Sequence, residues 1–120
     1  EPKESYKFVH LENQGVALLE ASIGSRRRSI SFSPECGRLY AKSIIESIAN
    51  NPELYSGKLE IFIAAAAVLR EFGTTEDARD CKKLAKLLKS SQDNLPLSSA
   101  LSTLSQDIFK NYSWLKRIFN

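Results

Sequence analysis

The chain has 120 residues and a mass of 13.4 kDa, close to the commonest size of one globular domain, and we predict a single domain over residues 1–120. Hydrophobic residues make up 42% and charged residues 26%, a balance that excludes an intrinsically disordered chain, and no apolar run approaches the length of a membrane span. The net charge is +3, and the excess lies in residues 74–120, which hold eight Lys/Arg and five Asp/Glu.

The first part of the chain, residues 1–33, has the pattern of short strands. Turn-forming residues separate three β-branched or aromatic segments, Tyr6–Glu12, Val16–Ala21 and Arg28–Phe32. In the third segment Ile30 and Phe32 alternate with serines, which is typical of a strand with one face toward a core. We therefore predict a short N-terminal antiparallel β-meander of about three strands.

From Pro34 onward the pattern changes to that of helices. Residues 34–120 predict four helices, at 34–49, 58–72, within 75–91 and from about 96 to the end. The second helix is apolar almost all round and is expected at the centre of the fold, and Gly73 after it is expected to supply a left-handed stop. The first helix is expected to bury Leu39, Tyr40, Ile44, Ile45 and Ile48. The expected fold class is α+β, predominantly helical, with the β-meander packed against four helices.

The third predicted helix, within Thr75–Ser91, separates into two faces. Small and apolar residues recur at three- and four-residue spacings on one side: Ala78, Cys81, Leu84, Ala85 and Leu88. The other side carries cations suited to neutralising the phosphates of a nucleic acid: Arg79, Lys82, Lys83, Lys86 and Lys89. The alternative is a solvated surface helix, because Glu76, Asp77 and Asp80 precede the lysines, which is the order that the helix dipole favours.

A second basic group, Arg26, Arg27 and Arg28, falls at the predicted tip of a hairpin. Three adjacent guanidinium groups cannot pair with one another, so the expected contact is a polyanion or an acidic partner. The alternatives are a plain surface loop and a basic cleavage or localisation signal. The sequence leaves open whether this triplet and the helical cations share one face, which would strengthen the case for nucleic acid.

The last predicted helix has large apolar residues on more than one face toward its end. The candidates for contact with a partner protein or a second copy are Trp114, Leu115, Ile118 and Phe119. Aromatic side chains beside cations are common in protein interfaces, which favours this interpretation. The alternative is a terminal helix packed on its own core.

Nothing in the sequence is typical of an enzyme. His10 is the only histidine, and no spacing brings it beside a nucleophile or an acid. The glycines stand singly, which argues against a loop that cradles phosphate. We therefore expect no catalytic residue, metal, cofactor or small-molecule substrate. Cys36 and Cys81 lie on apolar faces of predicted helices, and we expect two buried thiols in a reducing compartment, with an inter-helix disulfide left open. The chain shows neither a secretory leader nor any Met, so we expect an intracellular domain, in cytoplasm or nucleus, excised from a larger protein.

The sequence therefore predicts a non-enzymatic domain that binds RNA or single-stranded DNA through the basic helix and the arginine-rich hairpin tip. The alternative is a module for protein interaction or oligomerisation in a larger regulatory or viral protein, which uses the apolar C-terminal helix. The two hypotheses differ in salt dependence, because phosphate binding weakens steeply as salt is raised and apolar contact does not. No contact with a membrane is expected.

Overall fold

The computed structural model describes residues 4–11, 16–23, 26–32 and 34–119, with side chains described for residues 35–112. An antiparallel sheet of order β1-β2-β3 comes first, with strands β1 (Glu4–Leu11), β2 (Val16–Ile23) and β3 (Arg26–Phe32). It is followed by the helices α1 (Pro34–Asn50), α2 (Leu59–Phe72), α3 (Thr75–Leu88) and α4 (Leu95–Phe119). Short 3₁₀ turns connect the helices at Pro52–Leu54, Ser56–Lys58 and Gln92–Asn94.

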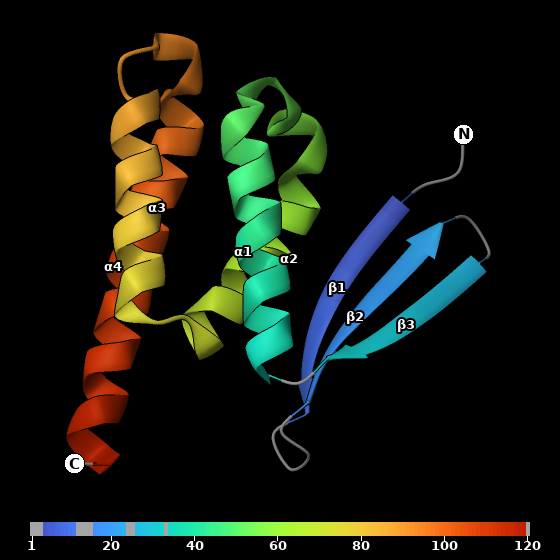
Figure 1. The fold of residues 1–120 in the computed structure, drawn as a ribbon. Helices are drawn as coiled ribbons and strands as arrows, with labels where there is room; N and C mark the ends of the chain where they lie inside the picture. The colour runs from blue at the N-terminus through green and yellow to red at the C-terminus, as the bar shows by residue number, and fades with distance from the viewer. Residues whose placement is uncertain (1–3, 12–15, 24–25, 33, 120) are drawn as a thin grey trace.

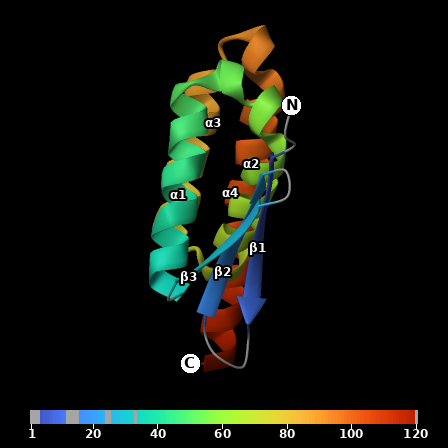
Figure 2. The ribbon, with the colours of Figure 1, turned by 90° about the vertical axis from the view of Figure 1, so that its right-hand side faces the viewer.

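The helices form two antiparallel hairpins, and the α1–α2 hairpin lies between the sheet and the α3–α4 hairpin (Figure 1). In keeping with this order, α2 contacts both β1 and α4, while α1 contacts β2, β3 and α3. Figure 2 shows the same three layers along their stacking direction, with the sheet in front. The Cα atoms extend over 41 × 40 × 15 Å, so the molecule is flat and each layer is only about one hairpin wide.

The hydrophobic core lies between the two helical hairpins. Ile45 of α1 and Leu69 of α2 are buried at its centre. The deepest row belongs to α4, where three- and four-residue steps bury Leu97, Leu101, Leu104 and Ile108. Full burial of one such side chain contributes about 1.5–3 kcal/mol, so this row anchors α4 to the other helices.

The fold class expected from the sequence, α+β with a β-meander packed against four helices, is wrong for the part of the chain whose side chains are described. Over residues 35–112 the structure is 91% helical, with four helices and no strand. Every buried residue of the described core lies in a helix or, like Gly73, beside one. The alternation of Ile30 and Phe32 with serines indicates only that this segment prefers an extended backbone. The position of the core depends instead on the longer apolar stripes of the helices.

Two further expectations about buried side chains are also wrong. Leu39 and Tyr40 of α1 are 51% and 40% exposed, while Ile45 and Ile48 are buried as expected. The cause is that the buried row of α1 centres on Ala41, which the larger neighbouring side chains obscured in the sequence pattern. Cys36 is exposed for the same reason, whereas Cys81 of α3 is buried as predicted.

Gly73 ends α2, but not through a left-handed conformation. Its φ of −65° and ψ of 150° are those of extended backbone, which other residues adopt as well. The position requires glycine because an added Cβ would collide with the carbonyl oxygen of Leu69 and lie 3.0 Å from Cγ2 of Ile108. The absence of a side chain thus lets α2 pass directly into α3 beside α4.

Candidate nucleic-acid interface

The start of α3 is fixed by a capping box. The Thr74 hydroxyl accepts a hydrogen bond from the Asp77 backbone N–H at 3.4 Å, and Oδ2 of Asp77 accepts one from the Thr74 backbone N–H at 3.0 Å. Such reciprocal bonds satisfy donors that the first turn of a helix leaves without partners. The cap therefore sets both where α3 begins and where the Asp77 carboxylate lies.

The Asp77 carboxylate is 1% exposed and is neutralised by two cations of α1. Nη1 of Arg38 donates to both of its oxygens, at 2.8 and 3.0 Å, and Nζ of Lys42 lies 3.2 Å from Oδ1. Nζ of Lys42 also lies 2.7 Å from Oδ2 of Asp80. Two carboxylates of α3 are thus paired with α1, on the side of α3 that faces the rest of the fold. We call this side the inner side of α3.

The electrostatics of this cluster keep Asp77 and Lys42 charged at neutral pH. Burial by itself raises the pKa of Asp77, but hydrogen bonds from Thr74, Arg38 and Lys42 outweigh it and hold the pKa below the ordinary value of 3.8. The pKa of Lys42 is raised, chiefly by its hydrogen bond to Asp80. The inner acids of α3 are therefore committed to structural ion pairs.

The outer side of α3 carries the cations predicted from the sequence. All five side chains are exposed, and none forms an ion pair with a described residue: Arg79, Lys82, Lys83, Lys86 and Lys89. From the first to the last, the helical rise gives a row about 15 Å long. We call this row the α3 cation row.

The other helix of the hairpin holds α3 in this orientation. The hydroxyl of Ser98 donates to the carbonyl oxygen of Ala85, and that of Ser105 to the carbonyl oxygen of Ala78, both at 2.6 Å. Between these two bonds lies Cys81, whose pKa burial raises to about 12, with Asp77 and Asp80 adding to the shift. The thiol is therefore protonated at neutral pH and serves packing, not nucleophilic chemistry.

The structure does not bring the arginine triplet to the α3 cation row. The triplet begins β3, with the Cα pairs Arg26↔Ile23, Arg27↔Ser22 and Arg28↔Ala21, so it lies at the end of the β2–β3 pairing where the chain passes from one strand to the next. β3 and α3 lie on opposite sides of the α1–α2 hairpin (Figures 1 and 2). The side chains of the triplet lie outside those described.

The partner-binding residues predicted near the C-terminus also lie outside the described side chains. Their backbone belongs to the last part of α4: Trp114, Leu115, Ile118 and Phe119. Among the described side chains nearest to them in α4, Phe109 is 54% exposed, and Lys110 and Asn111 are exposed as well. The expected contact surface therefore stays a prediction.

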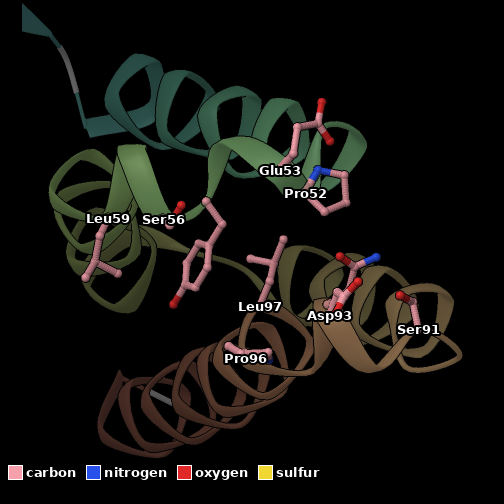
Figure 3. A pocket seen from close by; sticks show the side chains of 10 residues that line it. Pro52, Glu53, Ser56, Leu59, Ser91, Asp93, Pro96 and Leu97 are labelled. Atoms are coloured by element: carbon pink, nitrogen blue, oxygen red, sulfur yellow. The ribbon is translucent and has the colours of Figure 1, made fainter.

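A pocket of about 690 Å³ lies between the α1–α2 and α3–α4 connections. Figure 3 shows Pro52 and Glu53 from one connection, Ser91 and Asp93 from the other, and Leu97 between them. The residues that line it include two carboxylates and no cation. A phosphate is therefore not expected here, which separates this pocket from the α3 cation row.

Sequence reasoning found the α3 cation row but missed the role of Asp77 and its partners. The Thr74 and Asp77 spacing is that of a capping box and was the available signal. The partners Arg38 and Lys42 are more than thirty residues away, and a single sequence carries no signal for that contact.

Among the described residues, no group of His, Cys, Asp and Glu is placed to hold a metal ion. No helix in the same part of the chain combines the length and apolarity needed to cross a bilayer. Comparisons with known protein families, with curated proteins and with solved structures found no match for this chain.

Proposed function

We propose that the protein is a non-enzymatic nucleic-acid-binding domain whose α3 cation row neutralises backbone phosphates. One observation carries the proposal: the row is exposed and forms no ion pair with a described residue, while Asp77 and Asp80 of the same helix are paired with α1. An external polyanion would supply the missing counter-charge.

The alternative of a solvated helix face is weakened by the spacing of the cations. Lys82 and Lys86 are four residues apart, as are Arg79 and Lys83, and Lys86 and Lys89 are three apart. Like charges at these spacings destabilise a helix by about 0.2–0.5 kcal/mol per pair. A solvated face normally interleaves acids, whereas here Asp77 and Asp80 lie on the inner side of α3 and the exposed Glu76 stands in the first turn, before the cations. The arrangement costs stability and is explained by a binding role.

The arginine triplet is a separate part of the proposal. Because β3 lies across the α1–α2 hairpin from α3, Arg26, Arg27 and Arg28 would engage a polyanion independently of the α3 cation row. We also propose an intracellular location, in cytoplasm or nucleus, where nucleic acid is present. A role in protein interaction or oligomerisation through the end of α4 is the competing proposal.

Salt dependence and matched charge reversals test the function. We expect the protein to bind a fluorescent oligouridine. If all the cations of the row contact phosphate, the logarithm of the binding constant should fall with the logarithm of the salt concentration with a slope of about −3.5. That slope corresponds to a loss of about a hundredfold between about 50 and 200 mM salt.

The matched variants are Lys86→Glu, in the α3 cation row, and Lys58→Glu, in the α1–α2 connection, which change the net charge equally. Both lysines are exposed. Lys86→Glu should weaken binding about tenfold and reduce the salt slope, while Lys58→Glu should do neither. Equal effects of the two variants, or binding that does not respond to salt, would contradict the proposal.

A further inference from the structure

The two serine hydrogen bonds fix how α3 and α4 lie side by side. Ser98 and Ser105 are seven residues apart, and so are their acceptors Ala85 and Ala78, in the opposite chain direction. Each residue forward along α4 therefore lies level with one residue further back along α3. Phe109, four residues after Ser105, lies level with Thr74, four residues before Ala78. It is thus just beyond the Arg79 end of the α3 cation row, about 7.5 Å from Arg79 along the helix axis.

The same register places Phe109 and the lysines on one face. A residue four positions on in a helix is the neighbour rotated slightly to one side. Because α3 and α4 are antiparallel, moving four residues forward along either helix turns toward the same side of their contact, away from the core. On α3 this leads from Ala78 to Lys82 and from Ala85 to Lys89. On α4 it leads from Ser98 to Ser102 and from Ser105 to Phe109. All four of the residues reached are exposed. They flank the α3–α4 contact on the side opposite the core, which we call the outer face.

The chemistry of the outer face differs between its two helices. α3 contributes cations, whereas the exposed residues of α4 there include Ser102, Gln106 and the half-exposed ring of Phe109. No exposed residue in the described part of α4 is acidic, and Asp107, which is partly exposed, pairs with Arg70. A phosphate backbone is thus matched by the cations, and hydrogen-bonding groups and an aromatic ring lie beside them.

We propose that the outer face binds single-stranded nucleic acid, with the backbone along the α3 cation row and a base stacked on Phe109. The inference rests on the proposed function and specifies its ligand. In a duplex the faces of the bases are stacked on one another and cannot meet an aromatic ring, whereas in a single strand they are available. An exposed ring at the end of a cation row is therefore matched to a single strand.

The experiment compares three probes on the full chain: a labelled oligouridine, the same oligouridine paired with oligoadenosine, and inorganic polyphosphate, which has no bases. Phe109→Leu should weaken binding of the oligouridine about tenfold and leave that of polyphosphate unchanged. Phe109→Trp, which keeps an aromatic face, should bind the oligouridine at least as tightly as the natural chain. Since Phe109 is half exposed, both variants should unfold at the same urea concentration as the natural chain.

Several results would overturn the inference. Unchanged oligouridine binding by Phe109→Leu would show that no base stacks on Phe109, although the α3 cation row could still bind phosphates. Duplex binding as tight as single-strand binding would exclude the single strand as the preferred ligand. A fall in the mass in solution on Phe109→Leu would show that the ring mediates self-association. The proposed function itself fails, separately, if Lys82→Glu/Lys83→Glu/Lys86→Glu binds all three probes like the natural chain.

Discussion

The charged residues on the two sides of α3 differ in whether they form ion pairs within the fold. On the inner side, Asp77 and Asp80 are held by Arg38 and Lys42, and Asp77 is almost fully buried. On the outer side, the cations are exposed and have no acidic partner among the described residues. Asp77 and Asp80 thus hold α3 to the fold, and we propose that the cations of the same helix bind an external ligand.

This difference gives a physical criterion for separating structural from functional charges. A charge whose counter-ion lies within the fold is explained by stability, because removing it leaves a buried partner without compensation. A group of like charges with no such partner costs a little stability, and we propose that binding explains its presence. Substitutions on each side of α3 therefore distinguish the two roles.

The largest effect is expected at Asp77. Asp77→Ala removes one of the two hydrogen bonds of the capping box and leaves Arg38 and Lys42 without their buried acceptor, so it should lower the free energy of unfolding by about 3–5 kcal/mol. The matched change Asp80→Ala removes a partly exposed carboxylate with one ion pair and should cost less than about 1 kcal/mol. Urea unfolding measures both. Similar losses for the two variants would show that the inner cluster does not hold α3.

The backbone passage into α3 comes next. Gly73→Ala places a Cβ against the carbonyl of Leu69 and against Ile108, and should cost about 1–3 kcal/mol because the packed helices must shift. Gly57→Ala is the control, since a Cβ there has no neighbour within 4 Å, and its effect should stay within about 0.5 kcal/mol. Thermal unfolding of the two variants distinguishes close packing from a general preference for glycine.

The pH dependence of stability sharpens the view of the inner side. The pKa of Asp77 is lowered in the folded state, so its contribution is fully present above its unfolded value, near 3.8, and is lost as pH falls through the folded value. The natural chain should therefore lose stability between about pH 5 and pH 2, and Asp77→Asn should lose less over that range. Urea midpoints at several pH values provide the measurement, and parallel curves for the two proteins would contradict the assignment.

The smallest effect on stability is expected on the outer side. Lys86→Gln removes like-charge repulsion with Lys82 and Lys89 and should leave the free energy of unfolding unchanged or raise it by up to about 0.5 kcal/mol. Lys42→Gln is the inner-side control and should lower it, because Asp77 and Asp80 lose a partner. A clear loss of stability in Lys86→Gln would show that the outer cations also support the fold.

The helices and the two faces of α3 were predictable because they follow from local spacing. The periods of Ala78, Cys81 and Ala85 on one side and of Lys82, Lys86 and Lys89 on the other are properties of the helix itself. The predominance of helix was predicted, but the fold class was not, because the short alternating segments of residues 1–33 were counted as part of it. The exposure of Leu39 and Tyr40 depends on which side of α1 meets other helices, and no local pattern encodes that.

The candidate site was likewise predictable only where it follows from the spacing of residues within one helix. The α3 cation row was predicted. The pairing of Asp77 with α1, away from this row, depends on contacts between residues distant in sequence and was not. The neighbouring position of Phe109 depends on the register of α3 against α4, which the two serine hydrogen bonds set. The separation of the arginine triplet from the row depends on the order of the layers, which is equally non-local.

The central claim is that the outer side of α3 binds nucleic acid while the inner side holds the fold. The most direct test is the triple variant Lys82→Glu/Lys83→Glu/Lys86→Glu, measured for oligouridine binding at low salt and for urea unfolding in the same buffer. We predict that binding is abolished and that the free energy of unfolding stays within about 1 kcal/mol of the natural value. Undiminished binding by this folded variant would contradict the claim.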